Sequence, residues 1–478
     1  MQSDSTAPEA PPGRTLLLGG PRHPPVLPPV QLFLVSLALA CVAALLGYLN
    51  GTPEDAVLAA AVALLGGYMA ANIGANDVAN SVAPLVGARA LPLGTALLLA
   101  AGAEIAGALF AGDHIVGRIA FRIVDPEQVR DPVGFVYGMA AALAGAALWV
   151  NAANFIRAPI STTHAVIGGI VGVGLFALGA SAIAWGEIAA ITLGWFVSPV
   201  TSALAAIAIL AFLQRELLDV QNKVRAARTW IPILVAAMAA LFSFFLINKG
   251  LVNVWHPTTP VLATTVLAAF VGTLVLAGPY IRRASMGLAN RAQTVRKLFR
   301  VPLIAAGGFL AFAHGANDIA NIAGPVTAIL HVQATADLDL APDIPFWVFL
   351  LGALGLAAGL TLFGGGMVRM VATRITKINP VRAYAVAMAT AATVTAASWI
   401  GLPVSTTQIA VGAIFGIGFY REFRARKEQE IKENAEPKRP RRLIRRGDAL
   451  RIVVAWTITF PASAMISGLL YWLIVHVL

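Results

Sequence analysis

Apolar runs of about twenty residues recur along almost the whole chain, and they restrict its fold more than any other feature. A run of about 20 apolar residues is long enough to cross the hydrocarbon core of a bilayer as an α-helix. Of the 478 residues, 58% are hydrophobic and 12% are charged, whereas soluble domains average about 25% charged residues. Long continuous runs favour helices over a β-barrel, whose strands alternate. We therefore expect an all-α integral membrane protein, and not a soluble, disordered or collagen-like chain.

At about 20 residues per crossing, the sequence predicts thirteen membrane passages. Their approximate limits are 30–49, 54–88, 92–112, 134–155, 158–179, 184–213, 232–249, 258–281, 302–331, 345–371, 381–400, 403–420 and 451–477. The first passage is an extra N-terminal transmembrane helix. The Pro-rich residues 1–29 before it lack the layout of a cleavable signal, and we expect them to form a disordered cytoplasmic tail.

Basic residues gather in a few connecting segments, and these set the expected orientation. Segments 213–231, 281–301 and 421–451 are rich in Lys and Arg. Positively charged loops stay in the cytoplasm, and thirteen passages that begin inside place all three of them there. The net charge of +11 is therefore assigned to these loops and not to nucleic-acid binding. We predict a plasma-membrane or inner-membrane protein with a cytoplasmic N-terminus and an outside C-terminus.

Two motifs in the first half of the chain return in the second half. Gly-Ala-Asn-Asp-Val-Ala-Asn at 74–80 recurs as Gly-Ala-Asn-Asp-Ile-Ala-Asn at 315–321, with six of the seven positions identical. Pro-Ile-Ser-Thr-Thr at 159–163 recurs as Pro-Val-Ser-Thr-Thr at 403–407. Repeats of this kind indicate a duplicated chain.

The passage count sets the relative orientation of the two copies. The first copy enters the membrane from outside and the second from the cytoplasm, so equivalent segments run in opposite directions. Inverted repeats with broken helices or helical hairpins at the midplane are the layout of secondary transporters. We expect the first repeat at 54–213 and a region of linking helices and cytoplasmic loops at 214–301. The second repeat, which includes the basic loop, is expected at 302–478.

Each Gly-Ala-Asn-Asp copy places an aspartate inside an apolar segment. A charge at the bilayer centre costs about 2.5–3.5 kcal/mol on insertion scales, so such residues are usually functional. The glycine is expected to let the helix open, and the freed carbonyls together with carboxylate and amide oxygens would suit Na⁺. The carboxylate could instead carry a proton. Hydrogen bonding between helices would also account for the motif asparagines. The expected cation-coupling residues are Asp77, Asn80, Glu104, Asp318 and Asn321; for Glu104, which has no acidic counterpart in the second half, pairing with a nearby polar group is the alternative.

The two Pro-x-Ser-Thr-Thr stretches are typical of helix starts. Pro159 and Pro403 suit a position at or before a first turn, and the hydroxyls that follow can cap the helix while several backbone N–H groups stay free. A helix N-terminus inside the membrane with hydroxyl donors can bind an anion. Ordinary capping at the membrane surface is the alternative. The candidate anion donors are Ser161, Thr162, Thr163, Ser405, Thr406 and Thr407.

Taken together, these motifs closely resemble the inorganic phosphate transporter (PiT) family over roughly residues 54–478. The resemblance implies symport of inorganic phosphate with Na⁺ or H⁺ by alternating access. It also implies that Asn76, Asp77, Asn317 and Asp318 line the substrate site with the hydroxyls above. Two departures from the family are the passage at 30–49 and Gln408, which stands where the family commonly has His.

Other functions remain open at this stage. A sulfate permease on the same scaffold, an uncoupled anion channel and a receptor are the alternatives, and an intramembrane hydrolase built on Ser161 and His164 lacks a group to orient the histidine. With Cys41 as the single cysteine and no nucleotide-binding loop, we expect a non-enzyme with no cofactor. The expected partners are phosphate, the coupling ion, membrane lipid and, in a homodimer, a second copy of the chain.

Overall fold

The computed structural model describes residues 53–125, 128–129, 131–251, 255–335, 344–374, 378–430 and 446–477. The predicted tail at 1–29, the extra helix at 30–49 and residues 431–445 of the basic loop lie outside these described residues. Within them the chain is helical and forms no strand; a single isolated bridge joins Val124 and Ile183.

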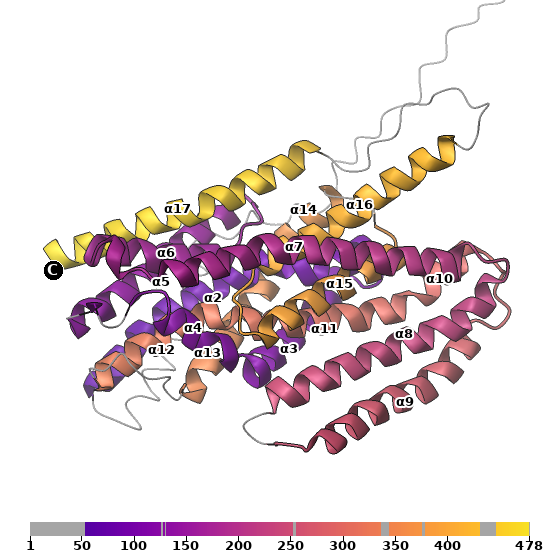
Figure 1. Cartoon of the computed structure of the whole chain (residues 1–478), viewed down its shortest axis with the longest axis horizontal. Helices are drawn as coiled ribbons and strands as arrows, with labels where there is room; N and C mark the ends of the chain where they lie inside the picture. Colours follow the sequence, from indigo (N-terminus) through magenta and orange to yellow (C-terminus); the bar gives the residue numbers. More distant parts are fainter. Residues whose placement is uncertain are drawn as a thin grey trace, which may run out of the picture.

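Sixteen α-helices make up the described part of the chain (Figure 1). They are α2 (Pro53–Gly87), α3 (Leu93–Ala111), α4 (Asp113–Phe121), α5 (Pro132–Phe155), α6 (Thr162–Ala177), α7 (Trp185–Leu213), α8 (Lys223–Phe245), α9 (Thr259–Ala284), α10 (Ala292–Leu298), α11 (Arg300–Asp318), α12 (Ala320–Thr335), α13 (Phe346–Leu362), α14 (Gly365–Arg374), α15 (Pro380–Trp399), α16 (Thr406–Glu430) and α17 (Arg446–Val477). Single π-helical turns extend α7 over Gln214–Leu218 and α8 over Leu246–Gly250.

From residue 54 onward, each predicted passage coincides with a helix or with a pair of consecutive helices. The expected boundary at 232 differs, because α8 begins at Lys223 and continues through Pro232. The passage at 158–179 also differs: residues 158–161 are not helical, and α6 begins only at Thr162.

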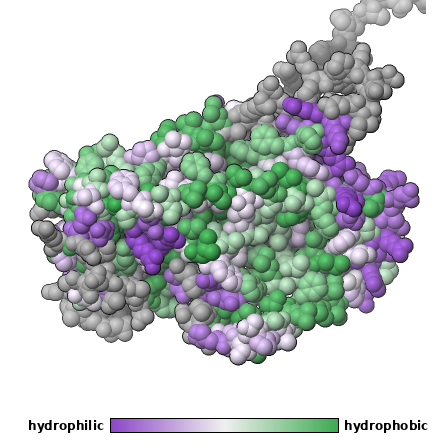
Figure 2. Space-filling model, in the orientation of Figure 1, coloured by the Kyte–Doolittle hydropathy of each residue, from purple (hydrophilic) through white to green (hydrophobic). Residues whose placement is uncertain are grey.

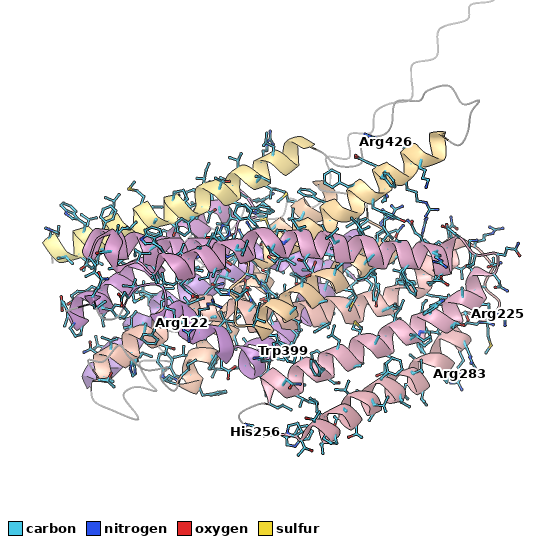
Figure 3. The ribbon with its side chains drawn as sticks, in the orientation of Figure 1. Arg122, Arg225, His256, Arg283, Trp399 and Arg426 are labelled. Atoms are coloured by element: carbon cyan, nitrogen blue, oxygen red, sulfur yellow. The ribbon has the colours of Figure 1, made fainter. Side chains whose placement is uncertain are left out.

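The helices form a multi-pass membrane protein. Seven helices of the described part are long and apolar enough to cross a membrane, and the pair α13–α14, bent by 62°, would make eight. Most helices run along the long axis of the molecule (Figure 1). The visible surface carries a broad hydrophobic belt between more hydrophilic ends (Figure 2). Arg225, Arg283 and Arg426 lie on one half of that axis and Arg122 on the other (Figure 3).

Helices from the two halves of the sequence pack against each other in a reciprocal pattern. Helix α2 packs on α13 while α11 packs on α3, and α6 packs on α17 while α16 packs on α7. Glycines allow two of these helix pairs, α6–α17 and α16–α7, to approach closely. A Cβ at Gly172 would collide with the backbone of Ala464, and one at Gly412 with the backbone of Pro199. Small residues let membrane helices approach this closely. The core is therefore shared by both halves.

Gly74 and Gly315 likewise allow close helix packing, of α2 on α13 and of α11 on α3. A Cβ at Gly74 would collide with the backbone carbonyl of Leu356, and one at Gly315 with the backbone carbonyl of Glu104. Helix α2 is continuous through residues 74–80, and the Ile319 N–H still donates to Gly315 O (3.2 Å) at the junction of α11 and α12. The expectation that Gly74 opens its helix is wrong, because close packing on α13 requires that glycine and α2 stays helical; in the second copy the helix is interrupted at Ile319.

Irregular backbone occurs instead in two helical hairpins. The first hairpin is α5–α6 and the second is α15–α16; residues 158–161 and 402–405 between their helices have no regular secondary structure. The turns before these segments contain Arg157 (φ 56°) and Gly401 (φ 68°). The predicted helix starts are confirmed: Ser161 Oγ accepts a hydrogen bond from the His164 N–H (3.1 Å) and Ser405 Oγ from the Gln408 N–H (3.2 Å).

Candidate functional site

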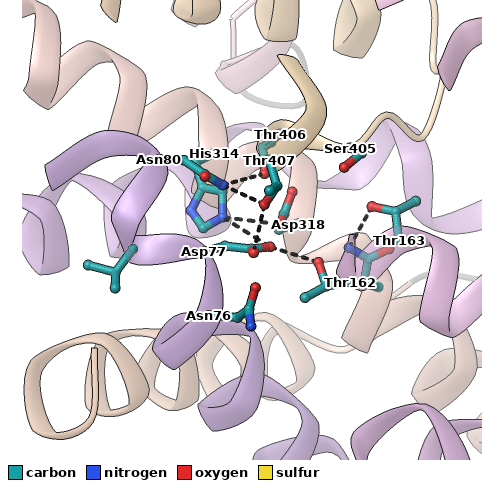
Figure 4. Close-up of polar contacts among 12 residues, drawn as sticks. Asn76, Asp77, Asn80, Thr162, Thr163, His314, Asp318, Ser405, Thr406 and Thr407 are labelled. Carbon is teal, nitrogen blue, oxygen red and sulfur yellow. Dashed lines mark hydrogen bonds and ion pairs between the residues drawn. The ribbon is translucent and has the colours of Figure 1, made fainter. Parts of the chain in front are cut away.

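The starts of α6 and α16 meet inside the protein. Thr163 Oγ1 donates to the backbone carbonyl of Val404 (3.2 Å), so the start of α6 contacts the segment just before α16. All ten predicted substrate residues are buried, together with Asn80, Glu104 and Asn321. Helices α2, α11 and α12 carry the two Gly-Ala-Asn-Asp motifs past this junction (Figure 4). The structure thus brings together motifs that lie far apart in the sequence.

Asp77 connects the two hairpins. Its Oδ2 accepts a hydrogen bond from Thr162 Oγ1 (2.8 Å), and its Oδ1 accepts one from Thr407 Oγ1 (3.0 Å). Hydrogen bonds to an ionised acceptor are shorter and stronger than those between neutral groups. One buried carboxylate therefore receives a hydroxyl from each hairpin.

The last asparagine of each motif contacts the hairpin of the other half. Asn80 Nδ2 donates to Thr407 Oγ1 (2.9 Å) and, at 3.4 Å, to Thr406 Oγ1. Asn321 Nδ2 donates to Thr163 Oγ1 (3.3 Å), and its Oδ1 has no hydrogen-bond partner. These contacts are the interhelical hydrogen bonds that the sequence left as an alternative, and they leave one buried oxygen of Asn321 available.

The first asparagine of each motif supports a hairpin. Asn76 Nδ2 donates to Asn154 Oδ1 (2.8 Å) and to the Ala158 carbonyl (3.1 Å), and its Oδ1 accepts from the Ile160 N–H (3.2 Å). The Asn76 side chain is therefore hydrogen-bonded to the backbone of residues 158–161 in the first hairpin.

Asn317 occupies the matching place in the second half. With its amide assigned so that both polar atoms have partners, it accepts from Ser398 Oγ (3.2 Å) and donates to Asp318 Oδ1 (3.1 Å) and to the Val404 carbonyl (3.0 Å). Both asparagines thus hold the backbone that leads to the Ser-Thr-Thr segments.

His314, which was not among the residues expected from the sequence, lies at the centre of the acidic groups. Its Nε2 is 3.1 Å from Asp318 Oδ2 and 3.9 Å from Asp77 Oδ2, while its Nδ1 is 2.9 Å from Glu104 Oε1. His314 and Glu104 are completely buried. The available signal was a histidine directly before the second Gly-Ala-Asn-Asp, where the first copy has Ile73.

Three side chains here could bind a cation. One ligand atom each from Asp77, His314 and Asp318 lies within 4.8 Å of the other two. Carboxylate oxygens suit a hard cation, and a histidine can ligate when neutral or occupy the cation position itself when protonated. The arrangement therefore combines cation ligands with two helix N-termini, which favour anions.

Comparison with known proteins identifies the family. The Phosphate transporter family matches residues 73–467. The chain belongs to this family. It is 39% identical over 394 residues to a Helicobacter pylori (strain J99) protein named "Putative phosphate permease", covering 82% of this chain and 73% of the relative. A Pyrococcus abyssi protein with the same description is 32% identical over 410 residues, covering 85% of this chain and 96% of the relative.

A solved structure has the same fold. The structure described as "The sodium-dependent phosphate transporter" matches with a TM-score of 0.78 and 32% identity, covering 87% of this chain and 99% of that chain. The family resemblance drawn from the motifs is thus confirmed. The family and the fold are those of transporters, and the chain is a multi-pass membrane protein of the Phosphate transporter family.

Proposed function

We propose that this phosphate transporter imports inorganic phosphate by symport with a cation, through alternating access. The observation that carries the proposal is the position of Asp77, whose carboxylate receives one hydroxyl from each hairpin. Buried helix N-termini with hydroxyl donors favour an anion, and an adjacent buried carboxylate favours a cation. Because both ligands would share one junction, binding of each affects the other.

Phosphate would bind where the starts of α6 and α16 converge. The proposed ligands are the hydroxyls and backbone N–H groups at 161–163 and 405–407, with Asn76 and Asn317 holding these segments in place. Thr162 and Thr407 now donate to Asp77, so they would exchange that carboxylate for a phosphate oxygen. A monoprotonated phosphate can also donate a hydrogen bond to Asp77 or Asp318, and sulfate cannot. This difference favours phosphate as the cargo.

The cation would bind beside phosphate, at Asp77 and Asp318. Asn80, Asn321 and Glu104 complete the proposed coupling set, with His314 added from the structure. If the coupling ion is Na⁺, a neutral His314 and the two carboxylates would surround it. If the coupling ion is a proton, it would be shared among these same groups. In either case the positive charge offsets the repulsion between phosphate and the buried carboxylates.

Alternating access would use two inverted repeats within thirteen crossings. The reciprocal packing of α2–α13 with α11–α3, and of α6–α17 with α16–α7, supports an internal twofold relation. The grouping of Arg225, Arg283 and Arg426 on one half of the long axis supports a cytoplasmic face there (Figure 3). The end of α17 lies at the opposite end (Figure 1), as an outside C-terminus requires.

Uptake into proteoliposomes tests the proposal. We expect accumulation of radiolabelled phosphate against its gradient when either an inward Na⁺ gradient or an inward proton gradient is imposed, and the effective gradient identifies the coupling ion. Sulfate should compete weakly. Phosphate flux that only runs downhill, with no response to either gradient, would show an uncoupled channel, and faster uptake of sulfate would overturn the assigned cargo.

A further inference from the structure

Arg118 links three separate parts of the molecule away from the Asp77 junction. From α4, its Nε pairs with the carboxylate of Glu187 in the first turn of α7, and its Nη1 donates to the backbone carbonyl of Gly401 (3.2 Å). The two charged side chains are 20% and 19% exposed, so they lie at the edge of the buried core. A guanidinium can donate through different nitrogens to a carboxylate and a carbonyl at fixed angles, which an ammonium does not do.

Gly401 is a sensitive point of the second hairpin. It lies in the turn after α15 with φ 68°. Only the non-helical residues 402–405 separate it from the start of α16. The same turn is held by Trp195, whose Nε1 donates to the Pro403 carbonyl (3.2 Å). Trp195 and Glu187 both belong to α7. A shift of this turn would therefore move the hydroxyls at 405–407 directly.

The helices that hold the turn are tied to each other. The segment after α4 and the segment before α7 form the isolated bridge between Val124 and Ile183. The Ala184 N–H donates to the Ile123 carbonyl (3.0 Å), and the Asp125 N–H donates to the Ala182 carbonyl (2.8 Å). Arg118 thus reaches the hairpin turn from a helix whose C-terminal end is hydrogen-bonded to the segment before α7.

The first hairpin has a different contact at the equivalent turn. There Arg157 takes the left-handed conformation with φ 56°, and its guanidinium lies beside Gly366 of α14. The arginine belongs to the hairpin itself in this case, whereas in the second hairpin it comes from α4. The contact from Arg118 is therefore specific to one hairpin and to one end of the molecule.

We infer that Arg118, oriented by Glu187, is a positioning residue that holds the second hairpin closed over the hydroxyls at 405–407. The inference rests on the proposed function for the meaning of those hydroxyls. Arg122, the residue after α4, lies on the opposite half of the long axis from Arg225, Arg283 and Arg426 (Figure 3), so release of Arg118 from Gly401 opens the second hairpin toward the face proposed as the outside. The first hairpin keeps its closed geometry when this contact is lost.

Thiol labelling tests the inference without requiring transport. Cys41 is the single cysteine, so Cys41→Ser provides a cysteine-free background. The reporter is Val404→Cys and the matched control reporter is Ile160→Cys, since each side chain is 1% exposed and lies just before a Ser-Thr-Thr segment. With an impermeant thiol reagent added from outside, Arg118→Gln should label Val404→Cys about tenfold faster, as expected from losing an ion pair and one hydrogen bond. Labelling of Ile160→Cys should not change.

Three further variants sharpen the test. Glu187→Gln should act in the same direction as Arg118→Gln, and Arg118→Lys should give an intermediate rate because it keeps the charge pair but loses the guanidinium geometry. Arg122→Gln, an exposed arginine just after α4, should have no effect. In uptake assays Arg118→Gln should raise the half-saturating phosphate concentration more than it lowers the maximal rate.

Two results would overturn the inference. Equal acceleration of both reporters would show a general loosening of the fold, and unchanged labelling of Val404→Cys in every variant would show that Arg118 does not hold the hairpin. Failure of the proposed transport would appear separately, as absent phosphate uptake by the unmodified protein.

Discussion

Asp77 and Asp318 belong to the same duplicated motif but have different surroundings. Asp77 accepts hydroxyls from both hairpins, Thr162 on one side and Thr407 on the other. Asp318 instead faces His314 at 3.1 Å and the amide of Asn317. Both copies of the motif therefore contain the carboxylate, but its partners differ between them.

The neighbouring helices explain the difference. Where α13 packs on Gly74 it presents Leu356, and where α3 packs on Gly315 it presents Glu104. The residue before each glycine changes in parallel, from Ile73 to His314. The contact of α2 with α13 thus carries apolar side chains, and the contact of α11 with α3 carries a buried Glu104–His314 pair (2.9 Å), which is an ion pair when His314 is protonated. Asp77 therefore joins the two hairpins, whereas Asp318 lies in a cluster of ionisable side chains.

Removing either carboxylate should have the largest effect. We expect Asp77→Asn and Asp318→Asn each to reduce coupled phosphate uptake to background while the protein still inserts and folds, because Asn keeps the volume and loses the charge that a cation needs. Uptake in proteoliposomes and elution of the purified protein as a single species measure both properties. Near-normal uptake by either variant would show that its carboxylate only stabilises helix packing.

Substitutions that break the buried Glu104–His314 pair should have the next largest effect, which is on stability. Glu104→Gln or His314→Gln alone leaves one buried group unpaired, which costs about 3–5 kcal/mol. The double variant Glu104→Leu with His314→Ile copies the apolar side chains at the contact of α2 with α13 and should recover most of the lost thermal stability, but not transport. Thermal unfolding in detergent, followed by tryptophan fluorescence, checks this. If the double variant were as unstable as the single variants, the contact of α11 with α3 would not be equivalent to the contact of α2 with α13.

The hydroxyls should give the smallest of these effects. Thr162→Val and Thr407→Val each remove a donor to Asp77, and hydrogen bonds to charged groups contribute about 1.5–3 kcal/mol. Each should raise the half-saturating phosphate concentration about ten- to a hundredfold, whereas Thr406→Val, which loses only a 3.4 Å contact with Asn80, should do less. The control is Thr95→Val on the exposed face of α3. If Thr162→Val and Thr407→Val behaved like Thr95→Val, phosphate would bind elsewhere.

Much of the molecule could be predicted from local sequence patterns. Apolar runs predicted the helices because burial of a helix in lipid depends on composition over a short window. The Ser-Thr-Thr starts were predictable because a cap joins residues three positions apart, as Ser161 and His164 show. The repeated motifs identified the family for the same reason: they are contiguous.

What the sequence left undecided depends on contacts between distant segments. Gly74 was expected to open its helix, yet whether a glycine bends a helix or admits a neighbour depends on the helix packed against it, here α13 at Leu356. The pairing of His314 with Glu104 is likewise set by the crossing of α11 and α3. No local pattern specifies which helices cross, because only burial of the whole core selects among the arrangements. Local patterns specified the helices and the repeated motifs, and tertiary packing decided which aspartate joins the hairpins and which one contacts the histidine.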